Sequence, residues 1–120
     1  MNSKQKALVL AEATQGKKSF DVRILDLREA NAFTDFFVIA TGTSDRHVRA
    51  LANAAIEAAH DYGERPLGVE GEETARWVLI DLGDVLVHLF QHDARAFYGL
   101  ERLWGEAESI ELPEAVGAAR

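Results

Sequence analysis

The sequence of 120 residues contains no cysteine. Disulfide bonds, thiol catalysis and zinc sites with cysteine ligands are thereby excluded, and a reducing compartment suits such a chain. No stretch approaches the ~20 consecutive apolar residues of a membrane-spanning helix. Near the amino terminus there is a short apolar run, Ala7–Ala11, which is shorter than the apolar core of a secretory signal. We therefore expect a cytoplasmic protein that does not enter a membrane.

Positive charge is also scarce. Lys and Arg together number 13 against 20 Asp and Glu, which gives a formal net charge of −7. An acidic chain repels phosphate backbones unless its basic residues cluster. We therefore expect no direct, sequence-specific binding of nucleic acid, and a basic protein partner suits the charge better. Solubility alone accounts for the same charge equally well.

Apolar residues make up 48% of the chain, enough for one domain with a single core. Apolar periodicity and turn residues predict these elements in order: a helix Ser3–Gln15, strands Phe20–Leu27 and Asp35–Thr41, a helix capped by Thr43 or Ser44 that runs to about His60, an extended piece Pro66–Gly71, strands Arg76–Leu82 and Val85–Gln91, and a helix Asp93–Trp104. This order favours an α/β or α+β fold, a mixed sheet of about five strands with helices packed on it. We expect one domain over residues 1–104.

Residues 105–120 differ in composition from the rest of the chain. This segment holds four glutamates, one arginine and Pro113, and it lacks aromatic residues. Such a segment has little apolar surface to bury. We therefore expect a disordered acidic tail.

The two strands Arg76–Leu82 and Val85–Gln91 form a predicted hairpin that is apolar on both faces. One face of the first strand carries Trp77 and Leu79, and the other carries valine, isoleucine and leucine. The long helix can cover only one of these faces. The second face is then either a surface for a protein partner or is covered by the carboxy-terminal helix through Trp104. Periodicity supports the two alternatives equally.

Patterns that indicate catalysis or metal binding are weak. Asp81 and Asp84 flank the hairpin turn, where aspartate is common for backbone reasons. His88 and His92 belong to a strand and its end, so they lie about 13 Å apart along it. The Gly42–Ser44 turn precedes a helix and could bind phosphate through free N–H groups, but it has a single glycine and no following lysine. We therefore expect no catalytic residue, no metal and no cofactor.

The sequence resembles the ribosomal silencing factor family, also called the Iojap family. The resemblance runs in order from about Asp21 to Trp104, without large gaps. It is carried by four segments: ATGTSDRHVRALA (Ala40–Ala52), PLGVEG (Pro66–Gly71), WVLIDLGDVLVHLF (Trp77–Phe90) and ARAFYGLERLW (Ala94–Trp104).

The resemblance implies a function. Family members bind the large ribosomal subunit through ribosomal protein L-fourteen, sterically block its association with the small subunit, repress translation and act in large-subunit biogenesis. The implied fold is similar to that of nucleotidyltransferases, which supports an alternative: a nucleotide-binding or nucleotidyltransferase-type enzyme using the Gly42–Ser44 turn. Those enzymes need two metal-holding acids one residue apart after the turn, and Asp45–His47 has no such pair. We therefore expect no enzyme.

With this resemblance, the second face of the hairpin is interpreted as a partner-binding surface. We expect a homodimer when the protein is free, because an exposed apolar face often pairs with itself. The expected apolar centre comprises Trp77, Leu79, Phe97, Tyr98 and Leu100, and the expected acidic residues that meet a basic partner are Glu70, Asp81, Asp84 and Glu101.

Overall fold

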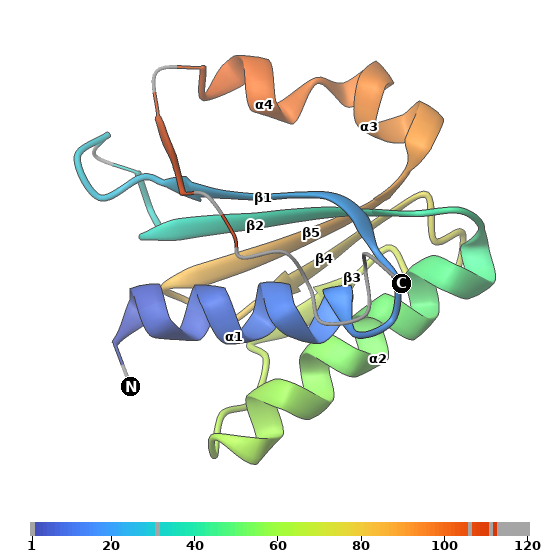
Figure 1. The fold of residues 1–120 in the computed structure, drawn as a ribbon, viewed down its shortest axis with the longest axis horizontal. Helices are drawn as coiled ribbons and strands as arrows, with labels where there is room; N and C mark the ends of the chain where they lie inside the picture. Colours follow the sequence, from blue (N-terminus) through green and yellow to red (C-terminus); the bar gives the residue numbers. More distant parts are fainter. Residues whose placement is uncertain (1, 31, 106, 111, 113–120) are drawn as a thin grey trace.

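The structure, a computed structural model, describes residues 2–30, 32–105, 107–110 and 112. It contains a six-stranded sheet with helices on both faces, which confirms the expected mixed α+β fold (Figure 1). The elements are α1 (Ser3–Gln15), β1 (Phe20–Asp26), β2 (Phe36–Gly42), α2 (Asp45–Asp61), β3 (Gly68–Glu70), β4 (Trp77–Asp81), β5 (Val85–Gln91), α3 (His92–Tyr98), α4 (Leu100–Leu103) and β6 (Glu108–Ile110).

The strand order is β3-β4-β5-β2-β1-β6. Strand β2 lies in the interior of the sheet and all seven of its residues are buried, as its continuous apolar run predicts. It pairs in parallel with β5, from Phe36 opposite Val85 to Gly42 opposite Gln91. Parallel strands need a long crossover, and α2, β3 and β4 supply it. The remaining strand pairs are antiparallel.

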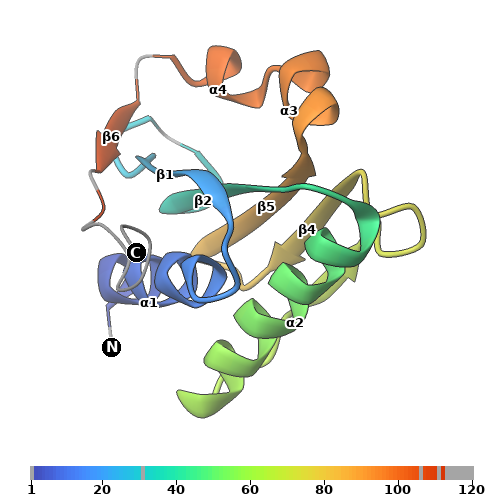
Figure 2. The same ribbon diagram turned by 45° about the vertical axis from the view of Figure 1, so that its right-hand side comes forward.

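Helices α1 and α2 lie side by side on one face of the sheet (Figures 1 and 2). Each begins at a side-chain cap: Asn2 accepts a bond from the Gln5 amide, and Ser44 accepts one from the His47 amide. The expected helix boundaries therefore hold, because capping and periodicity are local properties. The main core lies between these helices and the sheet, where Val78 of β4 is fully buried.

Helices α3 and α4 lie over the opposite face of the sheet (Figure 1). The sequence predicted one helix, Asp93–Trp104. This prediction was wrong, because the segment forms two short helices. Gly99 has a φ of 58°, in the left-handed region, and it ends α3 before α4 begins at Leu100. The chain bends there, so the two short helices follow the sheet below them.

The predicted tail was also wrong in part. Residues Glu108–Ile110 form β6, which pairs antiparallel with the edge of β1. An unpaired strand edge offers a row of free N–H and C=O groups, and three residues are too few for alternation to reveal a strand in the sequence. The sheet therefore has six strands instead of about five. Residues 106, 111 and 113–120 of the predicted tail lie outside the described residues. In the described part of the chain, no helix has the length and apolar character to cross a bilayer.

Candidate protein-docking surface

Strand β4 separates its side chains between the two faces of the sheet. Val78 and Ile80 are fully buried toward α1 and α2, whereas Trp77, Leu79 and Asp81 are partly exposed on the opposite face. The predicted division of the hairpin into two faces is therefore confirmed. Other elements cover only part of this second face.

The carboxy-terminal helices cover the middle of that second face. Trp104, just after α4, packs edge-on against Phe37 of β2, with the ring centroids 5.7 Å apart. Leu100 also packs here, against a second, smaller core that includes Phe37 and Phe90. The carboxy-terminal helices thus cover part of this face and leave part of it open, because α3 and α4 are short. The strands β2 and β5 are covered, while Trp77 and Leu79 on β4 stay partly exposed.

Trp77 is held on three sides. Its ring stacks on Phe90 with centroids 5.1 Å apart and lies 4.7 Å from the ring of Tyr98. Its indole N–H donates a hydrogen bond to Nδ1 of His88 over 3.1 Å. Trp77 is therefore a fixed aromatic group whose ring remains partly accessible.

Exposed aromatic side chains continue from Trp77 along α3. The Tyr98 ring meets Phe97 edge-on at 5.2 Å, and the two residues are 46% and 77% exposed. Such exposure is unusual for large apolar groups that touch one another. We refer to Trp77, Leu79, Phe97 and Tyr98 as the docking surface. Leu100, also predicted for this surface, is half-buried and packs against the core on this side of the sheet.

Two of the predicted acidic residues lie on β3 and β4. Glu70 is exposed and stands directly opposite Leu79 in the β3–β4 pair, so both side chains share one face of the sheet. Asp81 accepts a hydrogen bond from the Gly83 amide over 2.8 Å, which gives it a turn-forming role. Glu70 is therefore the acid best placed at the edge of the docking surface.

Asp84 lies at the turn and points toward α1. Its carboxylate binds Nζ of Lys6 at 2.6 Å, and Glu64 binds the same ammonium. Lys6 also donates to the carbonyl of Leu82 and is 5% exposed. Asp84 is thus part of a charge network that joins α1 to the hairpin.

Glu101 lies between two arginines. Its carboxylate accepts from Nε of Arg95 at 2.7 Å and lies 3.3 Å from Nε of Arg23. The hydrogen bond from Arg95 holds the pKa of Glu101 below its ordinary value. Arg95 also donates to the hydroxyl of Thr41, so it ties the two short helices to β2. The sequence did not reveal Arg95, because a spacing of six residues is not a helical pair and only the bend at Gly99 brings it to Glu101.

His88 is the other functional candidate whose environment the sequence did not reveal. It is 4% exposed, and burial lowers its pKa to about 4. Because Nδ1 accepts from Trp77, the proton of the neutral ring resides on Nε2, which has no hydrogen-bond partner in the described part of the chain. An unpaired buried donor costs about 1–3 kcal/mol. His92 is exposed at the start of α3, so the two histidines do not form one site.

The Gly42–Ser44 turn acts as the cap of α2. The Thr43 amide donates to Nδ1 of His47 over 2.9 Å, and the His47 amide donates to the Ser44 hydroxyl over 3.1 Å. These internal bonds occupy the Thr43 and His47 amides, two of the N–H groups that a phosphate could use. Among the described residues, no group of three or more His, Asp or Glu side chains could hold a metal ion.

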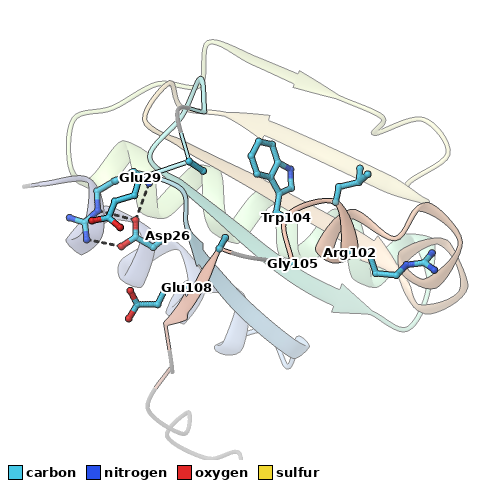
Figure 3. Close-up of a pocket in the computed structure, with 10 residues that line it drawn as sticks. Asp26, Glu29, Arg102, Trp104, Gly105 and Glu108 are labelled. Carbon is cyan, nitrogen blue, oxygen red and sulfur yellow. Dashed lines mark hydrogen bonds and ion pairs between the residues drawn. The ribbon is translucent and has the colours of Figure 1, made fainter.

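An open cleft of about 1000 Å³ lies elsewhere, between the turn after β1 and the segment that joins α4 to β6. Trp104 and the carboxylates Asp26 and Glu29 line it, whereas Arg102 points away from them (Figure 3). Asp26 is paired with Arg28 over 2.7 Å. The charges of this cleft are thus partly neutralised within the chain, and the docking surface is separate from it.

The fold and the site define a class: a small domain with a mixed sheet, helices on both faces and a partly exposed group of aromatic side chains. The family model described as "Ribosomal silencing factor during starvation" matches residues 1–120, and the chain belongs to this family. The resemblance found in the sequence is thereby confirmed.

Individual relatives agree with this assignment over nearly their whole length. The chain is 45% identical over 111 residues to a ribosomal silencing factor of Halalkalibacterium halodurans, covering 92% of this chain and 95% of that one. It is 40% identical over 112 residues to the factor of Bacillus subtilis, covering 93% and 95%. A crystal structure of a Chromobacterium violaceum protein superposes with a TM-score of 0.85 at 35% identity, covering 100% of this chain and 98% of the other.

Proposed function

We propose that this protein binds the large ribosomal subunit through ribosomal protein L-fourteen, sterically blocks association with the small subunit and so represses translation in the cytoplasm. A role in large-subunit biogenesis belongs to the same proposal. Membership of the ribosomal silencing factor family supports the ribosomal setting. The docking surface supports a protein contact as the means of binding.

The observation that carries the proposal is the state of Trp77. Its side chain contacts Phe90 and Tyr98 yet remains partly exposed, and Tyr98 in turn contacts the exposed Phe97. Rigid aromatic groups of this kind carry much of the affinity in protein interfaces. A net charge of −7 and the exposed Glu70 at the edge of the surface favour a basic partner.

The first test is Trp77→Ala. We expect binding to purified large subunits to weaken by about 30-fold, which corresponds to about 2 kcal/mol for an aromatic anchor. Co-sedimentation over a range of subunit concentrations measures this change. The matched control is Tyr62→Ala, which removes another exposed aromatic group just after α2, on the other side of the sheet. A folded Trp77→Ala variant that co-sediments like the unaltered protein would refute the surface.

A second measurement addresses the block of subunit association. Light scattering follows the joining of large and small subunits when the protein is added to large subunits beforehand. We expect joining to fall in proportion to the large subunits bound, and the Trp77→Ala variant to restore it. Normal joining at saturating protein would contradict the steric mechanism while leaving the binding proposal intact.

We also infer that the free protein forms a homodimer through the same docking surface. Phe97 is 77% exposed, and covering it against a second copy would bury apolar area. Multi-angle light scattering of the unaltered chain should give a dimer mass, and the Phe97→Asp variant a monomer mass. A monomer of the unaltered chain at high concentration would remove this inference.

A further inference from the structure

The centre of strand β5 carries a buried polar residue whose neighbours along the strand, Val87 and Leu89, are apolar. His88 stands between Leu79 of β4 and Ile39 of β2 in the pairing register. Its ring meets Phe37 edge-on with the centroids 4.5 Å apart. A leucine would fill this position without burying an N–H group that lacks a partner. The packing of the core therefore gives no reason for a histidine here.

The contact of His88 with the docking surface gives such a reason. Nδ1 of His88 accepts the indole N–H of Trp77 over 3.1 Å. Trp77 lies on β4 near an edge of the sheet, where ring contacts with Phe90 and Tyr98 do not by themselves set the direction of the indole N–H. The bond selects one orientation and satisfies the indole N–H inside the chain, so the partner meets the ring and not a free donor.

We propose that His88 is a positioning residue of the docking surface, which fixes Trp77 for its partner before binding. This inference rests on the proposed function. A side chain that is already ordered loses less conformational entropy when it binds. Only 4% of the His88 surface is exposed to solvent. His88 therefore acts through Trp77 and makes no contact with the partner.

The test compares two substitutions with the unaltered full-length chain. In His88→Phe the ring volume remains but the acceptor is lost. In His88→Asn the side-chain oxygen lies near the position of Nδ1 and can accept the indole N–H. We expect His88→Phe to weaken binding to purified large subunits by about three- to tenfold, the range for one immobilised side chain. We expect His88→Asn to recover most of that loss.

Nuclear magnetic resonance reports the bond independently of binding. The chain has two tryptophans, and the indole N–H of Trp104 serves as an internal reference. The Trp77 indole resonance should shift and exchange faster with solvent in His88→Phe than in His88→Asn. The control for stability is Val87→Ala on the same strand, a fully buried residue of the opposite face. It should lower the melting temperature and leave the Trp77 resonance and the affinity unchanged.

The outcomes separate this inference from the proposed function. If Trp77→Ala weakens binding and His88→Phe binds like the unaltered chain, the positioning role is overturned and the docking surface stands. If Trp77→Ala itself binds normally, the docking surface falls and the positioning role falls with it. Should His88→Phe not fold, His88→Gln replaces it, because the glutamine amide is one methylene further from the backbone and lies near the position of Nε2, away from that of Nδ1. Equal affinity of the Asn and Gln variants then overturns the inference.

Discussion

At the scale of single residues, the two buried polar side chains Lys6 and His88 differ in how many of their polar atoms have hydrogen-bond partners. Lys6 is buried but has three partners, two carboxylates and a carbonyl. His88 is buried with a partner on one ring nitrogen, and among the described residues the other nitrogen has none. The first group joins distant parts of the fold, and the second orients a surface tryptophan at a cost in stability.

Replacing Lys6 with methionine should destabilise the protein by about 1–3 kcal/mol, the range for a lost charged hydrogen bond. Methionine keeps the apolar stem but leaves Glu64 and Asp84 without their shared cation. Both acids are partly exposed, so water limits the loss. Urea unfolding measures it, and Lys4→Met on the exposed side of the same helix is the control. Equal unfolding midpoints for the two variants would contradict a stabilising role for the network.

His88 should make stability depend on pH. Burial lowers its pKa from 6.5 to about 4 in the folded chain, so the unfolded chain binds a proton at a higher pH than the folded one. The neutral ring's contribution is complete above pH 6.5, and it falls as the pH drops toward 4. Between pH 7 and pH 4.5 the unaltered chain should lose about 2–3 kcal/mol more than His88→Phe. Parallel pH profiles of the two proteins in urea unfolding would exclude this effect.

At the scale of elements, the two short helices α3 and α4 decide how much of the second sheet face is covered. Arg95 binds Glu101 and Thr41, and so fixes both helices against β2. The bend at Gly99 makes this possible. A single long helix, as predicted from the sequence, would not bring these groups together.

The connection between β3 and β4 sets the position of Trp77. Gly71 has a φ of 87°, and a Cβ added there would overlap the carbonyl oxygen of Trp77. Gly71→Ala should therefore cost about 2 kcal/mol or more and weaken binding to large subunits. Gly63→Ala is the matched control, because Gly63 has a φ of 76° but nothing within 4 Å of an added Cβ. Similar stability losses in the two variants would show that backbone strain, and not the clash, dominates.

At the scale of the whole molecule, the chain is acidic and one side of its sheet is only partly covered. The net charge of −7 acts over about a Debye length of 8 Å at physiological salt. The aromatic side chains of the docking surface interact with a partner only when they touch it. Charge should therefore govern how fast the complex forms, and aromatic packing should govern how slowly it dissociates.

Salt titration separates these two contributions. We expect the association rate with large subunits to fall by about tenfold between 50 and 500 mM salt, with a small change in the dissociation rate. Glu70→Gln should reduce the salt dependence, and Trp77→Ala should raise the dissociation rate. Kinetic measurements with immobilised large subunits distinguish the two. A salt-independent association rate would contradict electrostatic attraction to a basic partner.

The sequence alone determined the elements whose signals are local. The caps and apolar spacing of α1 and α2 and the continuous apolar run of β2 depend only on near neighbours in the chain. Its motifs also indicated the family. Tertiary structure decided the rest, because the deciding contacts join residues far apart: Trp77 with His88 across a strand pair, Lys6 with Asp84, and β6 with β1. Periodicity shows that β4 has a second apolar face, but only the placement of two short helices determines how much of it stays open.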